Sequence, residues 1–326
     1  MAQAMSRRQF IATGIGAFAC IPVARMSLGA TDVRVRLPKS PFRISVITDE
    51  ISQDFEHACD VASQQFGMSW VEVRGLWSKN VATLDSNDVS RALGILKKYD
   101  LRVSDIASPL FKIDWPDAPK SKAAERDQFN ANFTYQQQGE VLDRCIAVAK
   151  QFSADRIRCF DFWRLDDPVP YRKAINQVLQ NAAEKAGKAG LILVLENEMS
   201  CNTGTGAEAA KTLAGVPSEH FMLNWDPGNA ARLGEVPYPA GYNLLPKNRI
   251  GHCHVKDVAK TAKGFEWAAM GKGTIDWSGQ FAALKRDGYH YAVSLETHWR
   301  GPNGPEASSI ESWAGMKQAL QNAGAL

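Results

Sequence analysis

Short apolar runs rich in β-branched residues alternate along this chain with longer segments in which apolar residues recur every three or four positions. The short runs predict strands, and the longer segments predict helices that each bury one face. Such alternation is typical of a parallel sheet with helical crossovers. The eight predicted strands are Arg43–Thr48, Trp70–Val73, Arg102–Ile106, Arg156–Phe160, Ile192–Glu196, Met222–Asp226, Ile250–Val255 and Ala292–Glu296. The predicted helices are Phe55–Phe66, Val89–Tyr99, Val141–Phe152, Tyr171–Ala186, Ala207–Ala214, Trp277–Leu284 and Ile310–Leu320.

Eight strand–helix units predict an α/β fold, a (β/α)8 TIM barrel formed by residues 42–326 as a single domain; such barrels typically take about 250 residues. A doubly wound open sheet is the alternative, but it more often carries a glycine-rich phosphate turn after its first strand. Here that strand leads into Asp49-Glu50-Ile51-Ser52. The long, proline-containing segment Ser108–Phe133 predicts a loop on the catalytic face that could act as a lid.

Residues 1–30 have the pattern of an export signal. Arg7 and Arg8 precede an apolar run, Ile11–Ala24, which is shorter than the roughly 20 residues that a membrane-spanning helix needs. The paired arginines resemble a twin-arginine signal, which implies a periplasmic or otherwise exported protein with no stable membrane association after cleavage. An uncleaved anchor is the alternative.

The charge balance and the cysteines argue against two classes of protein, nucleic-acid-binding proteins and disulfide-rich domains. The net charge of +3 arises from 38 basic and 35 acidic residues, and the leader, with three arginines and no acid, accounts for all of it. We therefore expect no nucleic-acid partner. The six cysteines include no CxxC pair, which favours buried thiols over a disulfide framework and leaves a single disulfide open.

Polar side chains stand where four consecutive predicted strands end, which is where barrels build their active sites. Glu196, Asp226, His254 and Glu296 come from strands five to eight. Three converging carboxylates would repel one another unless a cation lay between them. The set predicts one divalent metal ion, with Mn²⁺ preferred to Mg²⁺, Co²⁺ or Zn²⁺. The alternative is that each carboxylate separately caps the helix that follows it.

Strand alternation places His252 on the same face as His254, one layer deeper in the barrel. We expect it to be a hydrogen-bonded core residue or a support for the metal ligand. Five tryptophans near strand ends could stack on a sugar or belong to the core: Trp77, Trp163, Trp225, Trp267 and Trp299. Arg74 and Arg158 could bind a phosphate, so phosphorylation of the substrate stays open.

At these strand ends the chain resembles the xylose-isomerase-like barrel superfamily, specifically its sugar phosphate isomerase/epimerase branch, over residues 42–322. The resemblance is carried by ITDEISQDFE (47–56), VEVRGLW (71–77), LEN (195–197), WDPGN (225–229), GHCHVKD (251–257), GKGTIDW (271–277) and SLETHW (294–299). In the ketose epimerases of this group, Glu, Asp, His and Glu from strands five to eight hold a metal. The resemblance assigns those roles to Glu196, Asp226, His254 and Glu296.

The chain departs from its relatives at two positions. Asn229 stands where many relatives have a histidine, and no Asp-x-His follows strand seven, which disfavours the DNA-repair endonuclease branch. Asn202 stands where the epimerases have a second glutamate, and Glu198 could replace it.

The resemblance implies proton abstraction beside a carbonyl through a metal-stabilised enediolate, with Glu196 and Glu296 as the catalytic pair. Substrate-binding roles fall to Glu198, Lys256, His298 and Asn229. The expected reaction is the isomerisation or epimerisation of a small carbohydrate or keto-sugar. A β-elimination on an exported 3-keto-glycoside is the main alternative, followed by a retaining glycosidase and a non-catalytic sugar-binding barrel. A homo-oligomer is compatible with the sequence.

Overall fold

The computed structural model describes residues 36–326 except 117 and 122–125, and these residues belong to one compact unit, Arg34–Leu326. The predicted export signal, residues 1–30, lies outside the described residues. In the described part of the chain, no helix is both long enough and apolar enough to cross a lipid bilayer.

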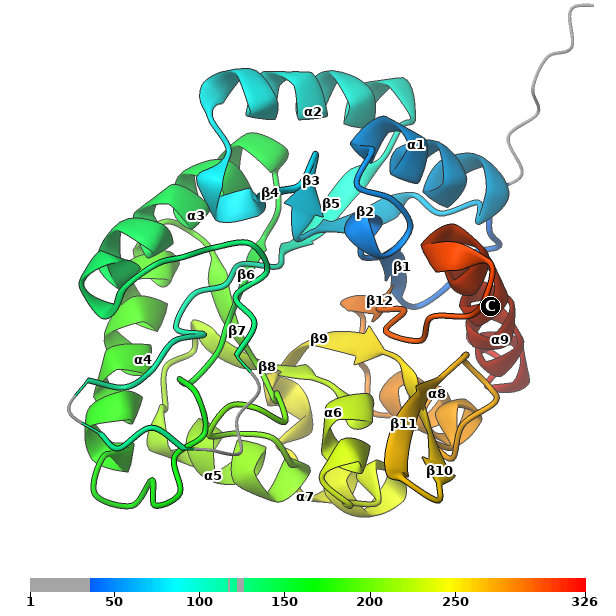
Figure 1. Cartoon of the computed structure of the whole chain (residues 1–326). Coiled ribbons are helices and arrows are strands. Elements are labelled where there is room, and N and C mark those ends of the chain that lie inside the picture. The colour runs from blue at the N-terminus through cyan, green and yellow to red at the C-terminus, as the bar shows by residue number, and fades with distance from the viewer. Residues whose placement is uncertain (1–35, 117, 122–125) are drawn as a thin grey trace, which may run out of the picture. The chain divides into compact units, whose positions relative to one another are not determined.

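Eight parallel strands form a barrel in the order β1-β12-β9-β8-β7-β6-β5-β2. A parallel bridge between Ile47 and Glu72 joins the two ends of this sheet. The structure thus confirms the (β/α)8 barrel, and each predicted strand is present with ends shifted by at most two residues (Figure 1). The barrel strands are β1 (Arg43–Val46), β2 (Trp70–Val73), β5 (Arg102–Ile106), β6 (Arg156–Cys159), β7 (Ile192–Glu196), β8 (Phe221–Trp225), β9 (Ile250–Val255) and β12 (Ala292–Leu295).

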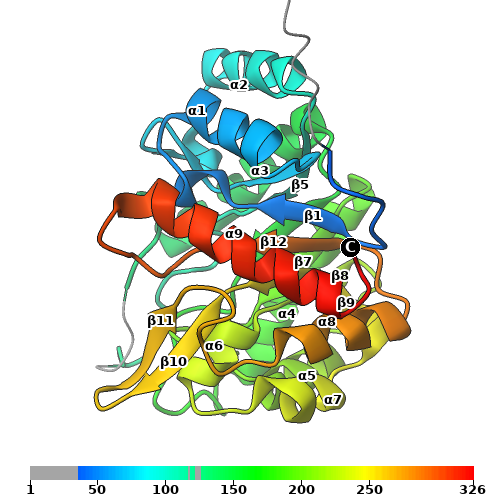
Figure 2. The same cartoon turned by 90° about the vertical axis from the view of Figure 1, so that its right-hand side faces the viewer.

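Helices surround the strands and bury their apolar faces against them, so the main hydrophobic core lies between the two layers (Figure 1). Figure 2 shows α9 lying across the side of the barrel, in front of β12. The helices are α1 (Phe55–Asp60), α2 (Ser86–Lys98), α3 (Gln138–Phe152), α4 (Arg172–Lys188), α5 (Gly206–Gly215), α6 (Pro227–Arg232), α7 (Tyr242–Leu244), α8 (Trp277–Arg286) and α9 (Gly304–Asn322). Shorter helical turns are Thr48–Glu50, Val61–Gln65, Val81–Thr83, Tyr135–Gln137, Pro237–Gly241 and Lys247–Arg249.

Three features were not predicted from the sequence. Helix α6 follows β8 directly, and the antiparallel hairpin of β10 (Asp257–Thr261) and β11 (Gly264–Ala268) follows β9. A smaller pair, β3 (Gly75–Leu76) and β4 (Lys79–Asn80), follows β2. All three extend the connections that leave the carboxyl ends of barrel strands.

The five cysteines in the described residues are all buried and free: Cys59, Cys145, Cys159, Cys201 and Cys253. They match the expectation of buried thiols. Within this part of the chain no disulfide contributes to the fold.

Candidate metal centre

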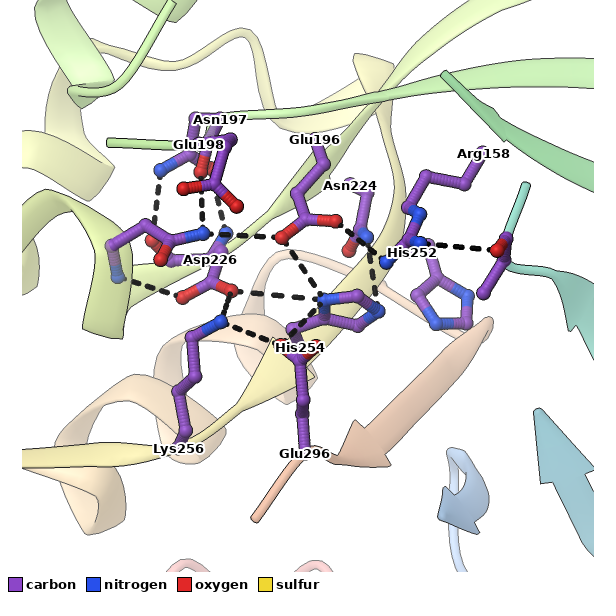
Figure 3. A network of polar contacts seen from close by, with 12 residues as sticks. Arg158, Glu196, Asn197, Glu198, Asn224, Asp226, His252, His254, Lys256 and Glu296 are labelled. Atoms are coloured by element: carbon purple, nitrogen blue, oxygen red, sulfur yellow. Dashed lines mark hydrogen bonds and ion pairs between the residues drawn. The ribbon is translucent and has the colours of Figure 1, made fainter. Parts of the chain in front are cut away.

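Four side chains meet at the carboxyl ends of consecutive strands (Figure 3). Glu196 ends β7, His254 lies in β9, and Asp226 and Glu296 directly follow β8 and β12. Each residue offers one ligand atom, and these atoms all lie within 4.8 Å of one another. All four residues are at most 1% exposed. The side chains that were singled out from strand ends therefore surround one point.

The imidazole of His254 stands at the centre of this cluster. Its Nδ1 lies 3.2 Å from Glu296 Oε2, 3.5 Å from Glu196 Oε1 and 3.6 Å from Asp226 Oδ2. His254 Nδ1 is buried and makes no hydrogen bond with good geometry to any described residue, whereas Asp226 Oδ2 has the Lys256 ammonium 2.8 Å away as an ion-pair partner. A buried nitrogen without a partner is costly unless something binds it. Three carboxylate oxygens and one imidazole nitrogen are donors that suit a divalent cation, so the residues present fit a metal.

Helix α6 explains how Asp226 can serve two roles. Asp226 caps this helix, because its Oδ1 accepts a hydrogen bond from the Asn229 backbone amide at 2.9 Å. Pro227 at the first helical position lacks an amide proton that would otherwise need a partner. The Asn197 side chain bonds both backbone groups of Asp226. Its Oδ1 accepts from the Asp226 amide at 2.7 Å, and its Nδ2 donates to the Asp226 carbonyl at 2.8 Å. Capping thus uses only Oδ1, while Oδ2 faces His254 Nδ1 and the Lys256 ammonium at 3.6 and 2.8 Å, so the capping and metal interpretations are compatible.

Buried cations hold the carboxylates in their ionised form. Lys256 Nζ lies 2.8 Å from Asp226 Oδ2 and 2.5 Å from Glu296 Oε2, and Arg158 Nη1 lies 3.0 Å from Glu196 Oε2. Burial by itself would raise the pKa of Glu196, but His254 and Arg158 outweigh it and lower that pKa to about 2. Burial likewise opposes ionisation of Glu296, yet Lys256 and the neighbouring imidazoles hold its pKa well below the usual range. Both glutamates are therefore proton acceptors at neutral pH.

A second layer of polar contacts lies deeper in the barrel. His252 and His254 each approach one oxygen of Glu72 through Nε2, both at 2.9 Å, and all three residues are fully buried. His252 is thus a hydrogen-bonded interior residue on the same face as His254, as strand alternation predicted.

A cavity of about 180 Å³ adjoins this cluster through Asn229 and His298, which contact Glu196 and Glu296; the four donors themselves do not line it. Of the residues predicted to bind substrate, Glu198, Asn229 and His298 line it, whereas Lys256 lies among the carboxylates. Asn229 also donates to Glu196 Oε1 at 3.1 Å, and Lys112 Nζ lies 3.3 Å from Glu198 Oε2. The predicted loop Ser108–Phe133 and hairpin β10–β11 contribute to its walls. The lining residues are Lys112, Asp127, Phe129, Glu198, Met199, Ser200, Asn229, Trp267 and His298.

The two arginines for which a phosphate-binding role was left open are engaged elsewhere. Arg158 is fully buried, bonds Glu196 and two backbone carbonyls, and does not line the cavity. Arg74 is committed to Asp49, Glu50 and Glu296, at 3.1, 2.7 and 2.9 Å.

Not all of the tryptophans singled out from the sequence line the cavity, and Asn202 does not line it either. Of the five tryptophans, Trp267 lines the cavity, whereas Trp225 is fully buried and donates to Gln280 at 3.0 Å. Asn202 takes no part in the cavity, because its amide bonds the backbone of Asp161 and Leu165.

Three residues of the site were not recognised from the sequence: Glu50, Glu72 and Lys112. Arg74 was singled out, but its binding of carboxylates was not foreseen. For Glu72 and Arg74 the sequence did contain a clue. In Val71-Glu72-Val73-Arg74, two charged residues alternate with the apolar residues of a predicted strand. A charge in a strand that is buried on both faces needs a buried partner.

The family comparison agrees with this geometry. Residues 61–319 match the family model described as xylose isomerase-like TIM barrel. The chain belongs to this family. No curated protein sequence matches the chain in a direct comparison.

Solved structures share the fold at low sequence identity. D-allulose 3-epimerase from Methylomonas sp. is 18% identical with a TM-score of 0.63, covering 88% of this chain and 100% of that one. The probable 3-DHS dehydratase of Bacillus anthracis is 18% identical with a TM-score of 0.63, covering 84% and 97%. A xylose isomerase-like barrel protein from Mycobacterium smegmatis, in complex with magnesium, is 16% identical with a TM-score of 0.63, covering 87% and 98%. Solved structures with this fold thus include an epimerase and a probable dehydratase.

Proposed function

We propose that this protein is a divalent-metal-dependent sugar isomerase or epimerase that removes a proton next to a carbonyl. The observation that carries the proposal is the convergence of Glu196, Asp226, His254 and Glu296 beside a cavity. Mn²⁺ is our first choice of metal, with Mg²⁺, Co²⁺ and Zn²⁺ as alternatives. The epimerase among the structural neighbours and the neighbour that contains magnesium support this proposal by analogy.

When bound, the metal would polarise substrate oxygens and stabilise negative charge on them. Glu196 and Glu296 lie on different strands and are held by different cations, Arg158 for the first and Arg74 with Lys256 for the second. One ionised carboxylate would accept the proton from the carbon beside the carbonyl, and the other, once it has taken up a proton from solvent, would deliver that proton to the opposite face. Return of a proton to the opposite face gives epimerisation, and delivery to the next carbon gives isomerisation.

The substrate that suits the cavity is an uncharged sugar. The ammonium of Lys112 is paired with Glu198 and lies 4.0 Å from the ring centre of Phe129, so its charge is already compensated. Asp127 adds a further acid to the wall. A phosphate would have to displace Glu198 from Lys112 to gain a cation here. Hydroxyl groups, in contrast, could bond Glu198, Asn229 and His298 without changing any charge.

A β-elimination on a 3-keto-glycoside is a second candidate, because an imidazole is placed to assist a leaving group. His298 lines the cavity, its ring centre lies 4.9 Å from that of Trp267, and its buried Nδ1 faces Glu50 and Glu296 at 3.5 and 3.8 Å. Burial lowers the pKa of this imidazole, so it would have to take up a proton before it could pass one to a departing oxygen. The dehydratase among the structural neighbours catalyses a reaction of the elimination type, by its name.

We also propose that the protein is exported by the twin-arginine route and acts on its sugar in the periplasm, with no nucleic-acid partner. This rests on the sequence of residues 1–30 alone. Arg7→Lys combined with Arg8→Lys should retain the full-length protein in the cytoplasm, as judged by cell fractionation. Export of the double variant at the normal level would contradict the proposal.

Proton exchange at a substrate carbon tests the main proposal. The Mn²⁺-loaded protein is incubated in D₂O with a panel of free ketoses, aldoses and 3-keto-glycosides, and deuterium in the recovered sugar is measured by NMR. Exchange that disappears with EDTA and returns with Mn²⁺ supports it. Hydrolysis without exchange, unaffected by EDTA, would indicate a glycosidase, and binding without exchange or turnover would indicate a sugar-binding barrel.

A further inference from the structure

Glu72 reaches the two interior histidines across the barrel, from a strand that β1 and β12 separate from β9. It lies in β2, and its two carboxylate oxygens are used separately, Oε1 by His254 Nε2 and Oε2 by His252 Nε2, each at 2.9 Å. The Asn224 amide nitrogen lies 3.1 Å from the same His254 nitrogen, and Asn224 Oδ1 has no hydrogen-bond partner among the described residues. With this amide turned over, Oδ1 accepts from a protonated Nε2 and Nδ2 no longer faces another donor. The carboxylate is fully buried, and the two imidazoles fix its orientation at both oxygens.

This contact decides which nitrogen of His254 carries a proton. An ionised carboxylate only accepts hydrogen bonds, so His254 must donate to it from Nε2. The other ring nitrogen, Nδ1, is then the one that can offer a lone pair. It is also the nitrogen that faces Glu196, Asp226 and Glu296 at 3.2 to 3.6 Å and has no hydrogen-bond partner among the described residues.

We infer that Glu72 is a positioning residue, which holds the proton of His254 on Nε2 and turns Nδ1 toward the divalent cation. His252 occupies the second oxygen and thereby prevents the carboxylate from rotating away. The inference rests on the proposed function, because it assumes that the four donors bind a metal. Carboxylates that orient a metal-binding histidine typically contribute 10–100-fold to metal affinity.

A second buried acid provides a matched control. Asp105, in the adjacent strand β5, is fully buried, and neither of its oxygens has a hydrogen-bond partner within the described part of the chain. It resembles Glu72 in burial and position but contacts neither histidine through a hydrogen bond. Burial and the nearby charge of Glu72 raise the pKa of Asp105 well above its ordinary value, which favours the neutral carboxyl. Asp105→Asn therefore replaces one neutral group by another and removes no hydrogen bond to either histidine.

The experiment measures Mn²⁺ affinity by calorimetry for the full-length wild type, Glu72→Gln and Asp105→Asn, with circular dichroism to verify folding. We expect Glu72→Gln to weaken Mn²⁺ binding by about 10–100-fold. Asp105→Asn should stay within about threefold of the wild type, since no ligand-orienting bond is lost. Wild-type affinity in Glu72→Gln, or equal losses in both variants, would overturn the inference. Absence of Mn²⁺ binding by the wild type would instead overturn the proposed function.

A second measurement needs no variant. In Zn²⁺-loaded protein with ¹⁵N-labelled histidine, long-range ¹H–¹⁵N spectra report which ring nitrogen is protonated. We expect His254 to carry its proton on Nε2 and the metal on Nδ1. The opposite assignment would overturn the inference even if Glu72→Gln could not be folded.

Discussion

Arg158 provides the counter-charge that the buried Glu196 carboxylate requires in the absence of metal. Its guanidinium is fully buried, lies 3.0 Å from Glu196 Oε2, and donates to the carbonyl oxygens of Ala107 and Ser108 at 3.0 and 3.3 Å. Arg158→Met keeps most of the apolar stem and removes all of these donors. Loss of one partner of a buried ion pair costs about 3–5 kcal/mol, because the other charge stays buried. Two carbonyls without donors add on the order of 1 kcal/mol each.

We therefore expect Arg158→Met to lower the free energy of unfolding by at least about 3 kcal/mol in EDTA, measured by urea denaturation with tryptophan fluorescence. Excess Mn²⁺ should stabilise the variant more than the wild type, because a cation at the four donors would again neutralise Glu196. Arg43→Met is the control, since Arg43 pairs with Asp155 at 2.8 Å but is partly exposed. Exposed pairs contribute at most about 1 kcal/mol. A loss no larger for Arg158→Met than for Arg43→Met would refute the reasoning.

Three further predictions follow from the same contacts. Glu196→Gln and Glu296→Gln should each reduce deuterium exchange at the substrate carbon by at least about 100-fold, whereas Lys256→Ala should reduce it less; glutamate variants as active as the wild type would exclude the acid–base assignment. Glu198→Gln should free the ammonium of Lys112 and tighten binding of inorganic phosphate, measured by calorimetry, and unchanged phosphate binding would argue against the pairing that makes the cavity selective for uncharged sugars. In metal-free protein, Glu196 has a folded pKa of about 2 against an ordinary 4.5, so it contributes stability above pH 4.5 that is lost as the pH falls toward 2. The difference in unfolding free energy between wild type and Glu196→Gln should shrink by on the order of 3 kcal/mol across that range, and a difference independent of pH would contradict the lowered pKa.

The fold was predictable because the barrel strands are buried on both faces and therefore appear as continuous apolar runs. Strand β7, for example, has the predicted bounds, Ile192–Glu196. Helix ends were less predictable, since they depend on caps: α2 begins at Ser86, three residues before the first apolar position, because Asp85 and Asp88 form a capping box. Helix α6 has only six residues, too few to show an apolar period. Hairpin β10–β11 is only partly buried, and its apolar residues do not form a continuous run.

The candidate site was predictable only as far as it follows strand ends. A carboxylate or imidazole at the end of an apolar run can be recognised from the neighbouring residues alone, and these strand ends meet because parallel strands share one edge of the sheet. The cations and the carboxylate that pair with these groups come from distant parts of the sequence. Arg74 reaches Glu296 across 222 positions of sequence, and Glu72 reaches His254 across 182, because barrel closure brings β2 toward the interior faces of β9 and β12. Spacing along the chain carries no information about such pairs.

Metal binding by the purified protein tests the central claim most directly. The wild type, Asp226→Asn and His254→Asn are stripped with EDTA, reloaded with Mn²⁺, desalted and analysed for metal content per chain. The four converging donors predict one ion per wild-type chain and a clear loss in both variants. A wild-type chain that retains no metal, or variants that retain as much as the wild type, would contradict the claim that these side chains form a metal centre.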